Sequence, residues 1–120
     1  MLLNLVFINI SMAAGELMTV KEAVAKGLFI AVKQAQGKYV FIFPTRLLEL
    51  AGYSHVHKPR AKADARSILS ALCNCGLLEY VGARSKRQVY CVREGTPLWD
   101  TIKKSNGAED VLRFIEKYVP

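Results

Sequence analysis

The chain has 120 residues, of which 52% are hydrophobic and 22% are charged, and its formal net charge is +7. This length and composition predict one folded domain with a sizeable core, and they exclude an intrinsically disordered chain. The excess of positive charge favours a partner such as nucleic acid, an anionic membrane surface or an acidic protein.

The N-terminal segment, residues 1–18, begins with an apolar and uncharged run. No Lys or Arg precedes this run, as a secretory signal peptide would require. The run is also shorter than the ~20 residues of a membrane-spanning helix. We therefore expect the segment to pack on the core or to contact another subunit, with a translation start at Met12 or Met18 as the alternative. The protein is expected to be cytoplasmic and to have no membrane association.

The next part of the chain predicts a helix, a strand and a short helix. In residues 19–37, Thr19 and Glu22 have the spacing of a capping box, and apolar residues recur with the period of a helix that ends at a glycine. Residues 38–43 (KYVFIF) are aromatic and β-branched, which is typical of a strand. Residues 44–52 open with a proline, which suits the first position of a helix.

A third helix is predicted from Pro59 to Cys75, and a hairpin follows it. The expected buried stripe of the helix consists of Ala61, Ala65, Ile68, Leu69 and Leu72. Residues 77–81 and 88–93 alternate in the manner of two antiparallel strands. Residues 82–87 are expected to form the loop between them, with a basic tip.

The C-terminal part, residues 95–120, predicts two more helices. Thr96 and Pro97 suit the N-cap and the first position of one helix, and residues 108–118 predict the other. The apolar side chains here exceed what a small domain edge needs. They either close the core or form a two-fold homodimer interface, and we favour the homodimer, which would place two copies of the helix of residues 59–75 on one face of the dimer. The residues expected at this interface are Leu98, Trp99, Val111, Leu112 and Ile115.

The order of the elements over residues 19–94 resembles the winged helix-turn-helix domain. The most specific part is Ile68–Tyr80 (ILSALCNCGLLEY), a helix that runs through a glycine into the hairpin. The resemblance implies an α+β fold that is mainly helical: a three-helix core with a small antiparallel sheet and a wing, followed here by the C-terminal helices. It also implies that the third helix enters the major groove and that the wing lies along the backbone or minor groove.

The positive charge lies in the part that the resemblance assigns to DNA. Residues 58–93 hold eight basic residues and two acidic ones. An α-helix fits the major groove, and Arg or Lys pairs with guanine, so the chemistry agrees with the resemblance. The residues predicted to contact double-stranded DNA are Arg46, Lys58, Arg60, Lys62, Arg66, Ser67, Ser70, Arg84, Lys86 and Arg87. The outer helix face is small and lacks Asn or Gln on its central turns, which favours nonspecific or shape-dependent binding.

The resulting hypothesis is a DNA-binding protein, either a small transcription regulator or a chromatin-associated factor. Two alternatives stay open: a winged-helix module that binds proteins within a transcription, replication or other complex, and a protein that binds structured RNA. A basic helix face is often only a solvated surface, so duplex binding needs a direct test. An enzyme is not predicted, because the sequence has no Gly-rich phosphate loop, no metalloprotease motif and no nucleophile elbow.

No cofactor or metal site is predicted. The three cysteines, Cys73, Cys75 and Cys91, do not have the spacing of a structural zinc site, even with the nearby His55 and His57. We expect Cys73 and Cys91 to be small buried residues. The two histidines are expected at the surface, and because they precede the recognition helix they are also phosphate candidates.

Overall fold

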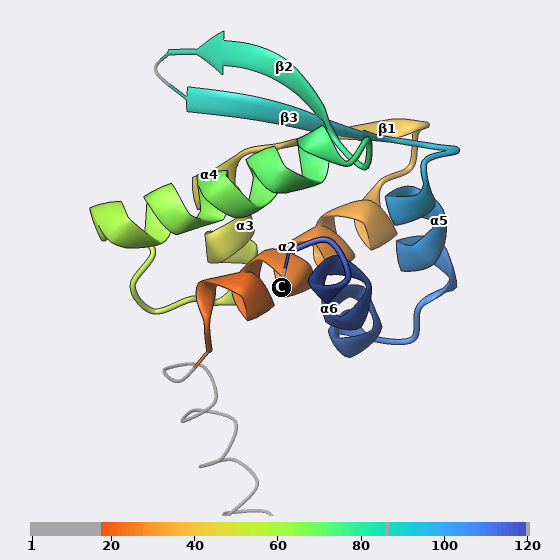
Figure 1. Ribbon diagram of the computed structural model, residues 1–120, viewed down its shortest axis with the longest axis horizontal. Helices are drawn as coiled ribbons and strands as arrows, with labels where there is room; N and C mark the ends of the chain where they lie inside the picture. Colours follow the sequence, from red (N-terminus) through yellow and green to blue (C-terminus); the bar gives the residue numbers. More distant parts are fainter. Residues whose placement is uncertain (1–17, 86, 120) are drawn as a thin grey trace, which may run out of the picture.

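The computed structural model describes residues 18–85 and 87–119. The apolar N-terminal segment is thus outside the described residues except for Met18, and so is Lys86. The described part is α+β and mainly helical, as predicted (Figure 1). Its elements are α2 (Val20–Gln34), β1 (Tyr39–Ile42), α3 (Pro44–Ala51), α4 (Pro59–Asn74), β2 (Glu79–Arg84), β3 (Arg87–Arg93), α5 (Pro97–Lys104) and α6 (Ala108–Glu116).

Helix α2 lies at the centre of the fold. The predicted capping box is confirmed: the Glu22 backbone N–H donates to Thr19 Oγ1 at 3.1 Å, and the Thr19 backbone N–H donates to Glu22 Oε1 at 3.0 Å. The helix ends at Gln34, three residues before the predicted glycine. Helices α3 and α6 pack on it (Figure 1). Its buried side chains are Ala23, Val24, Ala25, Leu28 and Val32.

A glycine sets the distance between α2 and α3. A Cβ added at Gly27 would lie 2.5 Å from the backbone oxygen of Leu47, far inside normal contact distance. The α2 backbone at Gly27 therefore lies directly against the α3 backbone at Leu47. Glycine permits this contact because it has no side chain. This close contact fixes where the first turn of α3 points.

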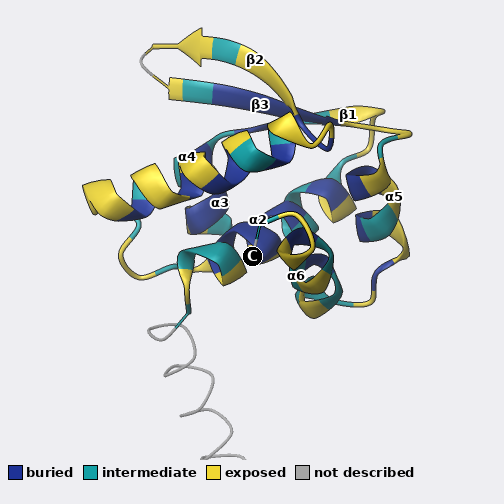
Figure 2. Cartoon of the chain, in the orientation of Figure 1, coloured by how far each residue is buried: buried dark blue, intermediate teal, exposed yellow. Residues whose placement is uncertain are grey.

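The three strands form an antiparallel sheet in the order β1-β3-β2. Ile42, Tyr90 and Val92 point toward the helices and belong to the core. Residues of the opposite phase on β1 stay open to solvent: Tyr39 is 49% exposed and Phe41 is 44% exposed. Figure 2 shows the difference between the strands, with β3 mostly buried between the more exposed β1 and β2.

The hairpin is longer than predicted, and the prediction of a loop over residues 82–87 is wrong. Strand β2 continues to Arg84 and β3 begins at Arg87, where these two residues pair. A register shift between Tyr80 and Gly82 inserts the extra residue, and Gly82 takes a φ of +132° that favours glycine. Pairing with β3 therefore extends β2 beyond the residues whose own sequence predicts a strand.

The C-terminal helices fold back on α2, which corrects the interface expected there. Leu98, Val111 and Ile115 are fully buried and Trp99 is 5% exposed, all within the chain's own core. Leu112 is half-buried and packs against the same core. These side chains close the core instead of facing a second copy, so a homodimer stays a prediction that needs other residues. None of the helices within residues 18–85 and 87–119 has the length and apolar character needed to cross a membrane.

Candidate nucleic-acid interface

Helix α4 presents one buried face and one polar face. The predicted buried stripe is confirmed for Ala61, Ala65, Ile68, Leu69 and Leu72. On the other side, Arg66, Ser67 and Ser70 are exposed and Lys62 is half-buried. The helix begins at Pro59 and is followed by Gly76, whose φ of +79° ends it. The period of the sequence thus predicts the five buried side chains of this helix.

A basic cleft lies where α3, α4 and β3 meet, and its volume is about 590 Å³. Four basic side chains from these three elements line it: Arg46, Lys62, Arg66 and Arg87. Its other lining residues are Phe43, Pro44, Thr45, Glu49, His57 and Gln88. Glu49 is the single acidic residue among those that line the cleft. The arrangement therefore creates a strongly positive hollow in the surface.

The cations of the basic cleft are not neutralised within the described part of the chain. The ion pairs found there join Arg60 to Asp64 at 4.0 Å, Arg93 to Glu79 at 2.6 Å and Arg113 to Glu109 at 3.9 Å. None of these involves a cation of the cleft. The cleft therefore keeps its charge available for an anion.

The first turn of α3 adds to this positive field. Thr45 and Arg46, at the start of the helix, both line the cleft. The first backbone N–H groups of a helix have no partner inside it, and the helix dipole is positive at this end. Leu47 is the first residue of α3 whose N–H bonds back, to the Phe43 carbonyl oxygen. Pro44 has no N–H, so the free backbone N–H groups at this end of α3 are those of Thr45 and Arg46.

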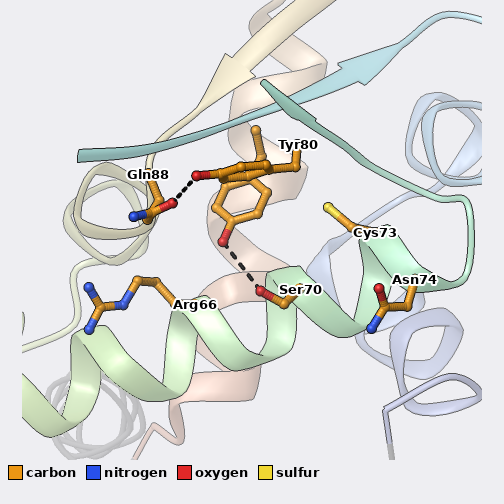
Figure 3. Close-up of a pocket in the computed structure, with 7 residues that line it drawn as sticks. Arg66, Ser70, Cys73, Asn74, Tyr80 and Gln88 are labelled. Atoms are coloured by element: carbon orange, nitrogen blue, oxygen red, sulfur yellow. Dashed lines mark hydrogen bonds between the residues drawn. The ribbon is translucent and has the colours of Figure 1, made fainter. Parts of the chain in front are cut away.

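A second hollow, the tyrosine pocket, lies beside the cleft between α4 and the hairpin. It has a volume of about 380 Å³ and is lined by Arg66, Ser70, Cys73, Asn74, Tyr80, Gln88 and Tyr90. Figure 3 shows Tyr80 and Gln88 on the hairpin across from Arg66 and Ser70 on α4. Arg66 and Gln88 line both hollows. The two hollows are therefore neighbours that share Arg66 and Gln88 as a common wall.

Hydrogen bonds order the walls of the tyrosine pocket (Figure 3). The Tyr80 hydroxyl donates to Gln88 Oε1, and the hydroxyls of Ser70 and Tyr90 lie 3.5 Å apart. The ring centres of Tyr80 and Tyr90 are 5.5 Å apart in an edge-to-face arrangement. Burial raises the pKa of the Cys73 thiol, so this part of the wall is uncharged near neutral pH.

The structure brings together some of the predicted DNA contacts and not others. Arg46, Lys62, Arg66 and Arg87 meet in the basic cleft, while Ser67 and Ser70 lie with Arg66 on the open face of α4. Lys58 and Arg60 lie at the start of α4, and Arg84 lies at the end of β2, all outside the cleft lining. Lys86 is outside the described residues. Ser70 is within hydrogen-bonding distance of Tyr90, which gives it a structural contact that the sequence did not indicate.

The lining residues that the sequence does not indicate include Thr45, Tyr80, Gln88 and Tyr90. Strand alternation carries a partial signal, because Gln88 and Tyr90 have the same phase and both face α4. The bulge after Tyr80 obscures that signal on β2. His57, a phosphate candidate from sequence, does line the basic cleft.

The cysteines and histidines do not gather into a site. Among residues 18–85 and 87–119, no group of three or more His, Cys, Asp or Glu side chains is placed to hold a metal ion. Cys91 is buried as predicted, Cys73 is only half-buried and Cys75 is exposed. Comparison with protein-family models, curated proteins and solved structures finds no match to the chain.

Proposed function

We propose that the chain is a winged-helix protein that binds double-stranded DNA through α4 and the β2–β3 hairpin. The element order from α2 to β3 and the sheet order β1-β3-β2 support this fold assignment. On this proposal α4 is the recognition helix and the hairpin is the wing. A transcription regulator or a chromatin-associated factor is the corresponding cellular role.

The observation that carries the proposal is the basic cleft. Four cations without an ion-pair partner in the described residues converge from α3, α4 and β3, which are separate in sequence. Charges that only keep a surface solvated do not need to come together in one cleft. Phosphate oxygens are the acceptors that match several Arg and Lys side chains and a helix N-terminus at once.

The chemistry of α4 favours binding with little base selectivity. Ala63, Ser67 and Ala71 lie beside Arg66 on the open face, where they offer little surface for reading base edges. Arg66 lines both this face and the cleft, whereas the other cleft cations are outside the lining of this face, where they suit backbone contacts. Binding is therefore expected to depend on duplex shape and salt more than on sequence.

The test is a titration of labelled blunt duplex DNA by fluorescence anisotropy at several salt concentrations. If each cleft cation meets one phosphate, the slope of log K against log salt is about −4. A double variant, Lys62→Ala with Arg66→Ala, is expected to weaken binding by about tenfold or more. The matched control removes two exposed cations elsewhere, Lys104→Ala with Lys117→Ala. A slope near zero, or equal losses in both double variants, contradicts the proposal.

A protein-binding module is the second candidate, and the outer face of the sheet favours it. Tyr39 and Phe41 form an edge-to-face pair there with ring centres 5.3 Å apart, and Val81 on β2 is exposed. On this reading, loss of the cleft cations leaves function intact, while Tyr39→Ser with Phe41→Ser removes it.

The same anisotropy titration with duplex RNA separates a preference for RNA from one for DNA.

A further inference from the structure

We propose that the tyrosine pocket binds one unpaired base of a nucleic-acid strand whose backbone lies in the basic cleft. This inference rests on the proposed function, since it assumes that nucleic acid occupies the cleft. It goes further by assigning the substrate class: a duplex with a single-stranded extension or gap, rather than a fully paired duplex.

The basic cleft and the tyrosine pocket are neighbours. Arg66 and Gln88 stand at the boundary between the cleft and the pocket and line both. On one side of them are Arg46, Lys62 and Arg87, which attract phosphate. On the other side the lining has no formal charge. A nucleotide has the same order of parts, with an anionic phosphate next to an uncharged aromatic base.

The side chains of the tyrosine pocket suit contact with a base. Tyr80 is 50% exposed, so part of its ring is open for stacking with a base. Because the Tyr80 hydroxyl donates to Gln88 Oε1, the amide N–H₂ of Gln88 keeps its donors for another partner. Asn74 adds a second amide to the wall (Figure 3). An aromatic surface beside side-chain amides suits the face and the edge of one base.

The tyrosine pocket is small for a ligand site. A volume of about 380 Å³ lies at the small end of the ~300–1,000 Å³ range of ligand pockets. The pocket therefore suits a single base, whereas the paired and stacked bases of a duplex cannot enter it without being extruded. Extrusion costs free energy that an unpaired base does not pay, so the pocket favours DNA with an unpaired nucleotide.

The experiment compares two labelled DNAs that share one duplex, one blunt and one with a short single-stranded extension. The first unpaired position carries 2-aminopurine, whose fluorescence falls when it stacks. Wild-type protein is expected to bind the extended DNA about tenfold more tightly than the blunt DNA and to quench the probe. Equal affinities, or an unquenched probe in the saturated complex, would overturn the proposal.

Variants assign the effect to the pocket. Tyr80→Ala is expected to remove the preference for extended DNA and the quenching, because it removes the half-exposed ring on which the base would stack. Tyr80→Phe keeps the ring and is expected to keep most of the preference. Tyr118→Ala removes a similarly exposed aromatic ring, 40% exposed, outside the pocket lining, and is the matched control. A preference that survives Tyr80→Ala would overturn the assignment.

Two further outcomes separate this inference from the proposed function. If blunt duplex binds with the expected salt dependence but no preference exists, only this inference fails. If neither DNA binds, the proposed function fails and this inference fails with it. Competition with deoxyadenosine monophosphate distinguishes a strand from a free nucleotide. If the mononucleotide displaces the probe as effectively as an unlabelled extended DNA does, the pocket belongs to a free nucleotide and the proposal is overturned.

Discussion

The cations of the basic cleft and those at the junction of α2 and α5 are of the same kind but have different surroundings. At the junction, Lys33 Nζ donates to the Lys103 carbonyl oxygen at 2.9 Å, and Lys103 Nζ donates to the Ala35 carbonyl oxygen at 3.4 Å. Lys103 also lies 5.1 Å from the centre of the Trp99 ring. These lysines bind the final carbonyl groups of two helices, as the helix dipole favours.

The cleft cations have no such role within the described chain. None of them takes part in the ion pairs found there, although the cleft lies against α3 and α4. The difference teaches that net charge alone does not identify a binding surface. A cation that already has an acceptor within its own chain stabilises the fold, whereas a cation without one is available to a ligand. Variants in both regions test this difference.

The largest expected effect is a loss of stability at the junction of α2 and α5. Trp99→Ala is expected to lower the free energy of unfolding by about 3–5 kcal/mol, because it leaves a cavity in the core. The ring is 5% exposed and belongs to the main core cluster. Urea denaturation measures the change. The folded fraction should bind DNA normally, so loss of DNA binding with unchanged stability would break the comparison.

A second variant affects both regions through the central helix. Gly27→Ala places a Cβ 2.5 Å from the Leu47 backbone oxygen, so α3 must move. We expect a loss of about 1–3 kcal/mol in stability from overpacking, and weaker DNA binding because Arg46 is on α3. Gly37→Ala is the control, since a Cβ there meets no atom within 4 Å. Thermal unfolding measures the change in stability, and anisotropy measures the change in DNA affinity. Unchanged stability and affinity in Gly27→Ala would contradict the close contact between α2 and α3.

A charge reversal in the cleft should change binding without changing the fold. Arg87→Glu is expected to weaken duplex binding by about tenfold or more and to reduce its salt dependence. Arg113→Glu, at an exposed position whose partner Glu109 is 3.9 Å away, should change the affinity by about threefold at most. Anisotropy at two salt concentrations measures both. Similar losses in the two variants would show that total charge, not its placement, governs binding.

The smallest expected effect distinguishes the junction lysines from ordinary surface lysines. Lys33→Met is expected to cost about 0.5–1 kcal/mol of stability through its lost hydrogen bond and to leave DNA affinity unchanged. Lys26→Met removes an exposed cation from the same helix and should cost less. Chemical denaturation of the two variants provides the comparison. Equal stabilities would remove the structural role of Lys33.

The sequence predicts those parts of the fold that depend on neighbouring residues. The capping box at Thr19 and Glu22, the helix starts at Pro44 and Pro97, and the buried stripe of α4 are all local patterns, and all are confirmed. The hairpin loop was wrong because the bulge near Gly82 arises from pairing with β3. Non-local pairing leaves no signal in a single strand.

The candidate site follows the same division. The sequence identifies the cations, but it cannot tell that Arg46 and Arg87 meet across α4, because this depends on how α3 packs against α2. It also shows that α5 and α6 have apolar faces without showing what covers them. The tyrosine pocket was not predicted at all, since it requires the phase of two strands and the distance to α4 together.

The pairing of Arg84 with Arg87 has a consequence for the hairpin itself. Like charges placed directly opposite on an antiparallel pair repel and destabilise it. A polyanion that lies between or beside them removes this repulsion, so the ligand stabilises the structure that binds it. Amide hydrogen exchange at this end of the ladder should therefore slow when DNA is bound and accelerate at low salt in its absence. Binding of a polyanion and ordering of the β2–β3 hairpin would then be coupled through this pair of arginines.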